Sequence, residues 1–157
     1  MRTMLAYVLI PLATIVTATL GSMFTTNGLG WYRTQSVPSW TPRKSVISGV
    51  WTAIFLLATM SALIAWRNVP DSQHFLLGIA FLTNALLNVL WSAVFFTFHQ
   101  KGLAVFEAVL LALSVVYLII VLWPYSVWAS VLLVPYFLWV CFAILLTFSV
   151  WRRNRKS

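Results

Sequence analysis

The sequence predicts an all-α membrane protein built as a bundle of five transmembrane helices. Hydrophobic residues make up 62% of the 157 residues and charged residues only 8%, whereas roughly a quarter of a soluble domain is charged. Five apolar stretches are each long enough to cross a bilayer, which takes about 20 residues. Because lipid offers the backbone no hydrogen bonds, each stretch is expected to be a helix. Little other chain is left, so we expect one membrane domain over residues 1–157.

The expected spans cover, in chain order, residues 5–24, 46–66, 74–98, 103–123 and 127–150. The first span, which follows Arg2, has some likeness to a signal peptide. Its apolar stretch is longer than a typical signal core, and more basic residues follow it than precede it, so we interpret it as a true span. The later connections are short, which makes consecutive spans antiparallel neighbours in a compact bundle.

The basic residues are concentrated at one end of this bundle. Only Arg2 and Arg67 belong to the end that holds the N-terminus. The other eight of the ten are Arg33, Arg43, Lys44, Lys101, Arg152, Arg153, Arg155 and Lys156. The positive-inside rule therefore places the first loop and the C-terminus in the cytoplasm and the N-terminus outside. The net charge of +8 then reflects topology and contact with lipid headgroups, and we expect no nucleic-acid partner.

The connection after the first span carries an unusual set of aromatic residues. Trp31, Tyr32 and Trp40 lie in it, and Pro38 and Pro42 flank the last of them. Loops between spans are usually short and polar, and the two prolines restrict the backbone on either side of this tryptophan. We therefore expect the loop to pack on the bundle as a lid over a pocket.

The second and third spans supply candidate walls for such a pocket. Trp51 and Phe55 share one face of the second span because they are four residues apart. On the third span one helical stripe carries Asn84, Asn88, Trp91 and Phe95. Amides are costly in hydrocarbon, so both asparagines are expected to face the bundle interior. They could simply bond neighbouring helices, but two amides in line with a tryptophan favour the polar end of a pocket.

The fourth span contains a row of small residues and an acid. Ala104, Ala108 and Ala112 repeat at four-residue spacing, which lets helices approach closely. The row could serve a dimer seam, but packing inside the bundle is the favoured interpretation. Glu107 lies about one turn from the basic end, and an intramembrane carboxylate suggests a functional site. We expect Lys101 to neutralise it, with proton coupling as the alternative.

The fifth span adds a further aromatic wall. Trp139, Ala143 and Leu146 share one face, and the tryptophan lies too deep for an interfacial belt. Aromatic side chains from several helices at this depth favour a flat apolar ligand, held by about 0.5–1.5 kcal/mol per stacking contact beyond burial. Pro135, like Pro11 in the first span, either bends its helix or is simply tolerated.

Conventional catalytic and metal sites are not supported by the sequence. The acids Asp71 and Glu107 lie toward opposite ends of the bundle, as do His74 and His99, so neither pair is expected to act together. The single cysteine, Cys141, belongs to no metal-binding cluster. We expect no metal and no required cofactor.

Three sequence patterns together resemble one family. They are W-Y-x5-P-S-W-T-P at residues 31–42, A-L-L-N-x-x-W-x3-F-F at residues 85–96 and P-Y-x-x-W-x3-A at residues 135–143. With Trp51 between the first two, they occur in the order and spacing of the TspO/MBR family. Its members are the tryptophan-rich sensory proteins of bacteria and the mitochondrial translocator proteins, or peripheral benzodiazepine receptors. The chain departs at Arg43, where the family commonly has a second proline, and at Val37, where a basic residue is often found.

The resemblance implies a five-helix bundle, often homodimeric, whose first loop folds over a pocket for porphyrins such as protoporphyrin IX. Carried over by position, the pocket residues are Tyr32, Trp51, Phe55, Asn88, Trp91, Trp139, Ala143 and Leu146. The polar stripe of the third span adds Asn84 and Phe95 to these candidates. Basic side chains at the pocket mouth could meet the porphyrin carboxylates, and the candidates are Arg33, Arg43 and Lys44.

We therefore expect a membrane receptor or sensor of tetrapyrroles in a bacterial-type cell membrane, with two alternatives. Some bacterial members of the family promote light- and oxygen-dependent breakdown of protoporphyrin IX, and the tryptophans that match Trp51 and Trp139 are implicated there. The other alternative is transport of porphyrin-like or sterol-like ligands. The sequence does not favour transport, because it lacks the internal repeat typical of secondary transporters.

Overall fold

The computed structural model describes residues 2–155, with side chains from residue 4 onward. Lys156 and the side chain of Arg2, both used in the charge argument, lie outside the described residues. In chain order the elements are α1 (Arg2–Tyr32), α2 (Lys44–Asn68), the 3₁₀ helix η1 (Asp71–Gln73), α3 (His74–Ser92), the π-helix η2 (Ala93–Thr97), α4 (Lys101–Leu122), α5 (Val127–Val131) and α6 (Val134–Arg153). Within this range they make five spans long and apolar enough to cross a membrane, which confirms the predicted fold class.

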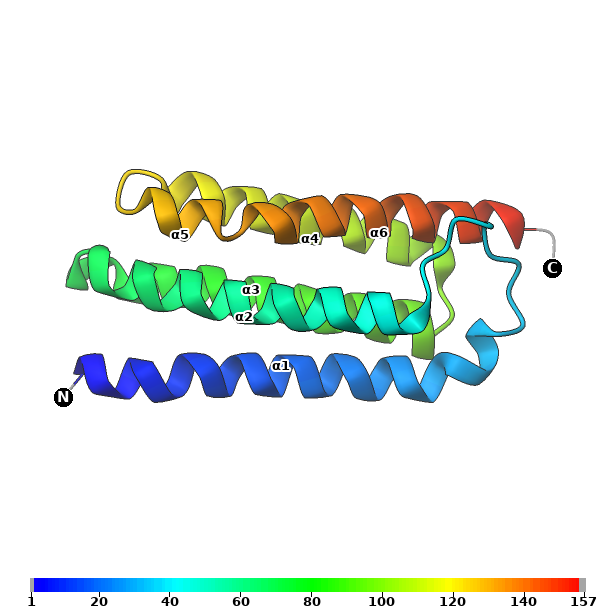
Figure 1. Cartoon of the computed structure of the whole chain (residues 1–157), viewed down its shortest axis with the longest axis horizontal. Coiled ribbons are helices and arrows are strands. Elements are labelled where there is room, and N and C mark those ends of the chain that lie inside the picture. Colours follow the sequence, from blue (N-terminus) through cyan, green and yellow to red (C-terminus); the bar gives the residue numbers. More distant parts are fainter. Residues whose placement is uncertain (1, 156–157) are drawn as a thin grey trace.

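The long helices run along one common axis (Figure 1). α1 packs against α2 and α3, α3 packs against α4, and α4 packs against α6. The segment 33–43 between α1 and α2, here termed loop 1, lies at the same end of the bundle as the C-terminus (Figure 1). The N-terminus lies at the opposite end, here termed the far end. The termini are therefore separated as an odd number of spans requires.

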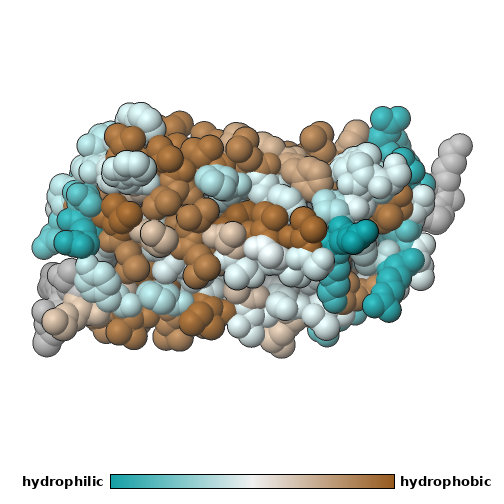
Figure 2. All heavy atoms as spheres, in the orientation of Figure 1, coloured by the Kyte–Doolittle hydropathy of each residue, from teal (hydrophilic) through white to brown (hydrophobic). Residues whose placement is uncertain are grey.

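The outer surface of the bundle is suited to lipid. Figure 2 shows apolar residues across the middle of the molecule and hydrophilic residues gathered toward its two ends. Large apolar side chains such as Val8, Leu56 and Ile120 are 62–64% exposed. A continuous apolar surface of this kind marks contact with an apolar partner, here the bilayer.

α1 is longer than the sequence analysis predicted and continues to Tyr32. Trp31 and Tyr32 therefore lie on its last turn, and the prediction that both belong to the loop is wrong. No proline occurs between Pro11 and Pro38 to stop the helix, and the glycines within it are tolerated. Loop 1 is correspondingly short, and Trp40 is its only aromatic residue.

Two of the predicted spans change their helix geometry along their length. The fifth is divided at Leu132 and Leu133 into α5 and α6, and Pro135 occupies the first turn of α6, where an amide partner is not needed. Pro11, in contrast, lies inside a continuous α1. The third span ends in the π-helix η2, and His99 after it has a φ angle of 58°. Short π-helical turns often mark functional positions.

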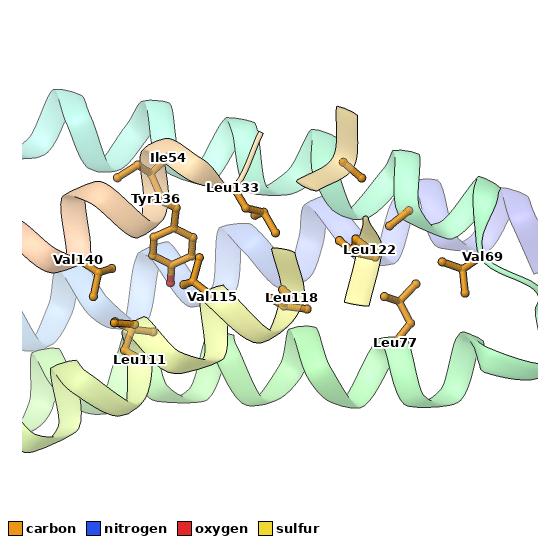
Figure 3. Packing of buried hydrophobic residues seen from close by; sticks show 13 residues of the cluster. Ile54, Val69, Leu77, Leu111, Val115, Leu118, Leu122, Leu133, Tyr136 and Val140 are labelled. Carbon is orange, nitrogen blue, oxygen red and sulfur yellow. The ribbon is translucent and has the colours of Figure 1, made fainter. Parts of the chain in front are cut away.

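α4 lies at the centre of the packed core (Figure 3). Its buried side chains pack against buried residues of α2, α3 and α6, and Figure 3 shows the ring of Tyr136 from α6 directed toward α4. The α4 residues of this cluster are Leu111, Ala112, Val115, Leu118 and Leu122.

The alanine row of α4 is buried within the bundle. Ala104, Ala108 and Ala112 are 0%, 1% and 7% exposed, and α4 packs closely with α6. Small side chains let neighbouring helices approach each other, which explains their place here. The prediction that the row serves packing inside the bundle is therefore confirmed.

Candidate ligand-binding site

A cavity of about 670 Å³ lies between α1, α2 and α3. This volume falls within the range of about 300–1,000 Å³ that is typical of small-molecule sites. The α1 wall is almost entirely aliphatic, whereas the aromatic residues of the lining are Phe55, Trp66, Phe81 and Tyr136. Asp71 and His74 line the cavity toward the far end, and Asn84 and Asn88 line it deeper in the bundle.

A chain of hydrogen bonds forms the polar part of the lining. Asn88 Nδ2 donates to the Tyr136 hydroxyl at 2.9 Å, and this hydroxyl donates to Asn84 Oδ1 at 3.2 Å. Asn84 Nδ2 in turn donates to Ser114 Oγ at 2.8 Å, which donates to the Leu111 carbonyl at 2.7 Å. The chain joins α3, α6 and α4. Both asparagines are buried, and their expected direction toward the bundle interior is confirmed.

The same side chains retain capacity to bind a ligand. A carboxamide has two N–H groups and an oxygen with two lone pairs, and a phenol oxygen accepts as well as donates. The bonds of the chain use one donor nitrogen of Asn84 and one of Asn88, each in a single bond. A polar ligand edge that reaches this part of the cavity could therefore bond without breaking the chain.

Trp51 does not line the cavity but packs on the core side of two residues that do. Its ring lies 5.7 Å from the ring of Phe55 and 6.2 Å from that of Tyr136, and both of these residues line the cavity. Of the ten predicted ligand-binding residues, the lining contains Phe55, Asn84 and Asn88. Trp51 supports them from the side of the core.

The far end of the cavity is lined by a stacked pair that the sequence analysis missed. The rings of Trp66 and His74 stack with their centroids 4.2 Å apart. His74 Nε2 lies 3.0 Å from the Trp66 carbonyl oxygen and 3.1 Å from that of Val69, so the imidazole caps the end of α2. His74 Nδ1 lies 3.6 Å from Asp71 Oδ1. Asp71 and His74 are the polar side chains that line the cavity at this end, as far as the structure describes it.

Four predicted pocket residues instead pack together near loop 1. Trp91 and Phe95 stack at 5.8 Å, and Tyr32 meets Phe95 edge-on at 5.9 Å. Phe95 is 3% exposed, and Leu146 packs against the same cluster. In this arrangement the rings contact one another rather than an open space.

Trp139 is linked to loop 1 through another ring. It stacks on Phe142 at 5.1 Å, and Trp40 of loop 1 meets Phe142 edge-on at 5.7 Å. Loop 1 therefore packs onto α6, and none of its described residues lines the cavity, so its role as a lid over a pocket stays a prediction. Trp139 and its neighbour on the same face, Ala143, are half-buried and do not belong to the lining of the cavity.

Loop 1 is fastened by side chains that the sequence analysis overlooked. Asn154 Oδ1 accepts from the Ser36 amide, and Asn154 Nδ2 donates to the Ser36 carbonyl, both at 2.9 Å. Lys101 Nζ donates to Gln35 Oε1 at 2.9 Å. Pro38, within loop 1, is buried. These partners are separated by 118 and 66 residues in the sequence, so no local pattern identifies them.

The three candidate carboxylate-binding side chains lie apart from the cavity. Arg33, Arg43 and Lys44 are exposed at the loop-1 end. The lining of the cavity, as far as the structure describes it, contains none of the three. A ligand confined to the cavity would therefore not reach them while loop 1 is closed.

The expected ion pair between Glu107 and Lys101 is wrong. Glu107 is 3% exposed, and neither carboxyl oxygen has a hydrogen-bond partner among the residues described. The two positions are six residues apart, which turns them about 120° from each other around α4. Lys101 instead bonds Gln35, and its Nζ lies 5.7 Å from the centre of the Trp31 ring.

Tyr136 is the main functional candidate that the sequence analysis left out. It lies in the P-Y-x-x-W pattern and is 4% exposed, in the middle of the polar chain. A buried tyrosine needs a partner for its hydroxyl, so its place inside a span was a usable signal. Ser114 carried a weaker signal, because a serine within a helix can bond its own backbone.

This chain is similar in sequence to one family model and to several known proteins. The TspO/MBR family model matches residues 7–152. Protein CrtK of Rhodobacter capsulatus is 32% identical over 125 residues, which is 79% of this chain and 78% of that protein. The tryptophan-rich protein TspO of Archaeoglobus fulgidus is 31% identical over 146 residues, or 91% and 93%. The human translocator protein is 28% identical over 129 residues, or 81% and 76%.

Proposed function

The chain belongs to the TspO/MBR family, and from this premise we propose that it is a membrane receptor or sensor of porphyrin-type tetrapyrroles. One observation carries the proposal. The cavity between α1, α2 and α3 combines aromatic lining with a chain of amide and phenol groups. A porphyrin is a large aromatic plate with carboxylates on one edge, so it needs apolar contact over its faces and polar groups at its rim.

The proposed binding mode uses the deep part of the cavity. The plate lies against Phe55, which Trp51 backs, while its polar rim bonds Asn88 or Tyr136. Each ring contact adds about 0.5–1.5 kcal/mol beyond simple burial. Asn84 orients the Tyr136 hydroxyl that the ligand meets.

In this proposal, movement of loop 1 opens a second binding region at the loop-1 end, because none of the described residues of loop 1 lines the cavity. Movement of the loop would release Trp40 from Phe142 and free space beside Trp139, Ala143 and Leu146. Tyr32, Trp91 and Phe95 would then contact the ligand as well. Only in this open state could the porphyrin carboxylates meet Arg33, Arg43 and Lys44.

Light-driven breakdown of the porphyrin is a second candidate, favoured by the position of Trp51. Its ring contacts two residues of the cavity lining, so an oxidisable indole lies one side chain away from a bound porphyrin. Trp139 lies further from the cavity and packs on Phe142. An electron donor of this kind needs no acid–base pair.

Orientation and oligomeric state belong to the same proposal. Loop 1 and the C-terminus lie at one end of the bundle, where most basic residues of the sequence also fall. We place this end in the cytoplasm and the N-terminus outside. A homodimer follows from the family resemblance. Reporter fusions at each terminus and native mass spectrometry test these two points.

Titration of the detergent-purified protein with protoporphyrin IX in the dark tests the binding proposal. Tryptophan fluorescence should fall saturably, because the deep indoles lie near the ligand. Trp51→Phe should weaken binding through a reduced ring contact and Asn88→Leu through a lost hydrogen bond. Each loss is about 2- to 12-fold, the equivalent of about 0.5–1.5 kcal/mol. Trp128→Phe is the control, since this indole is 73% exposed.

The outcomes separate the candidates. Absence of saturable binding to the unaltered protein would contradict the proposed function. Binding followed by illumination in air then distinguishes the two roles. An unchanged porphyrin supports a sensor, whereas its loss, slowed in Trp51→Phe, supports breakdown.

A further inference from the structure

Unpaired polar atoms are buried on α3 and α4, on residues that do not line the cavity. Trp91 Nε1 and both carboxyl oxygens of Glu107 are the buried side-chain atoms for which the described residues supply no hydrogen-bond partner. Native structures rarely leave such atoms without a bond to protein or ordered water. An unpaired donor and an unpaired acceptor in one bundle therefore need an explanation.

The register of α3 against α4 brings Trp91 opposite Glu107. Across this antiparallel interface Asn84 bonds Ser114 at 2.8 Å. A step of seven residues, about two turns, returns to the same face of a helix. Taken toward loop 1 on both helices, this step leads from Asn84 to Trp91 and from Ser114 to Glu107. One turn closer to loop 1, Val94 and Phe95 pack in one buried cluster with Ala104 of α4, which agrees with this register.

The hydroxyl of Thr147 on α6 lies at the same height along the bundle axis as Glu107. Ala104 of α4 and Val150 of α6 pack in one buried cluster. The two helices are antiparallel, so three residues further into the bundle lie Glu107 and Thr147. Thr147 is 2% exposed, and its hydroxyl can donate as well as accept a hydrogen bond. Three helices thus bring an indole N–H, a carboxyl group and a hydroxyl to one level.

We propose that Trp91, Glu107 and Thr147 form a buried site that binds one water molecule, with Glu107 as a neutral carboxylic acid. A buried water typically makes about three hydrogen bonds to polar groups that lack other partners. The indole donates to the water, while the carboxyl and hydroxyl groups complete its shell. A carboxylate without a cation in the membrane interior would be far more costly than the acid.

The charged and titratable groups on the surrounding elements leave Glu107 without a counter-ion. On its own helix Lys101 is turned away and bonds Gln35. On α6 the Tyr136 hydroxyl is bonded to both asparagines of the polar chain. The other groups on or next to the packed elements are His74 and His99, each stacked on a tryptophan, the exposed Arg152, Arg153, Asp71 and Tyr117, and the half-buried Cys141, Tyr32 and Tyr125.

The proposed water site lies between the cavity lining and the aromatic cluster under loop 1. Trp91 follows Asn88 of the cavity lining by three residues and stacks on Phe95 of the cluster under loop 1. A fixed water would hold the indole in this position. It would also place an exchangeable proton within the membrane, at a site outside the cavity lining.

Infrared spectroscopy of the ligand-free protein tests the proposal. The chain has only two acidic side chains, Asp71 and Glu107, and Asp71 is 93% exposed, so carboxyl bands can be assigned by substitution. At neutral pH we expect the carbonyl band of a protonated acid, shifted by exchange into D₂O. The band should persist in Asp71→Asn and disappear in Glu107→Gln. Its absence from the unaltered protein would overturn the proposal.

Two further variants test the partners of the acid. Trp91→Phe and Thr147→Val each remove one hydrogen-bonding group and should move the band toward that of a more weakly bonded acid. Thr52→Val, at an exposed threonine of α2, should leave it unmoved. A band unaffected by Trp91→Phe and Thr147→Val would show that the three residues do not share a site. A band that moves without a water stretch sensitive to H₂¹⁸O would mean direct side-chain contact and would exclude the water.

Discussion

α1 is held differently at the two ends of the bundle. At the loop-1 end its backbone lies directly on the π-helix η2, since a Cβ atom added to Gly28 would overlap the carbonyl group of Phe96. Toward the far end α1 lines a cavity of about 670 Å³ that it shares with α2 and α3. One apolar helix thus belongs to the tight core over one part of its length and forms a cavity wall over another. We infer that the loop-1 end fixes the bundle while the cavity provides room for a ligand.

The aromatic residues show the same contrast. Near loop 1, Trp91, Phe95 and Tyr32 contact one another. Around the cavity, Phe55 and Tyr136 have Trp51 on one side and open volume on the other. Rings that already contact each other contribute to stability, whereas rings beside open volume are available for stacking on a ligand.

The largest expected effect is at the contact between α1 and η2. Gly28→Ala should destabilise the protein by about 3 kcal/mol or more, the upper end for overpacking, because the new methyl group meets backbone that cannot rotate away. Gly30→Ala is the matched control, since its Cβ would meet none of the described atoms within 4 Å. Thermal unfolding in detergent measures both. Equal melting temperatures for the two variants would show that α1 is not tightly held at this end.

Enlarging an alanine should separate the packed seam from the cavity wall. Ala104→Leu places a larger side chain in the seam of α4, where the alanine is 0% exposed, and should cost about 1–3 kcal/mol. Ala13→Leu adds the same atoms to the α1 wall of the cavity and should leave the unfolding temperature nearly unchanged. A comparable loss in both variants would contradict the difference between the two ends.

A smaller and local effect is expected at the anchor of loop 1. Asn154→Ala removes two bonds to Ser36, each worth about 0.5–1.5 kcal/mol, so loop 1 should open about 5- to 160-fold more often. Asn68→Ala, at the far end, removes a bond to the backbone of its own helix and serves as control. Hydrogen exchange of residues 34–41 measures the opening. Unchanged exchange in Asn154→Ala would mean that other contacts hold the loop.

The helices were predictable from the sequence, because hydropathy and the cost of unpaired backbone in lipid leave no other solution. The inward direction of Asn84 and Asn88 was predictable for a related reason, since amides avoid hydrocarbon. The helical state of Trp31 and Tyr32 was not predictable, because a loop rich in aromatic residues and the end of a helix have similar compositions. The π-helix η2 likewise has no distinctive sequence pattern.

Details of the site depended on tertiary register that one sequence does not reveal. The predicted helical stripe on the third span is present, but its four residues contact different parts of the protein. They are Asn84, Asn88, Trp91 and Phe95. The first two line the cavity, while the other two belong to the cluster under loop 1. The error at Glu107 had a simpler cause, because proximity in sequence was taken for proximity in space. Six residues along a helix place two side chains on different faces.

The central claim is that the ligand occupies the cavity between α1, α2 and α3. Gly78 lines this cavity, and Gly49 on α2 does not, yet a Cβ at either would meet no described atom within 4 Å. The most direct test is therefore the affinity for protoporphyrin IX of Gly78→Phe and Gly49→Phe, followed by porphyrin absorbance. We predict at least about tenfold weaker binding, about 1.4 kcal/mol, for Gly78→Phe and unchanged binding for Gly49→Phe. Undiminished affinity in Gly78→Phe, with an unchanged unfolding temperature, would show that the ligand binds elsewhere.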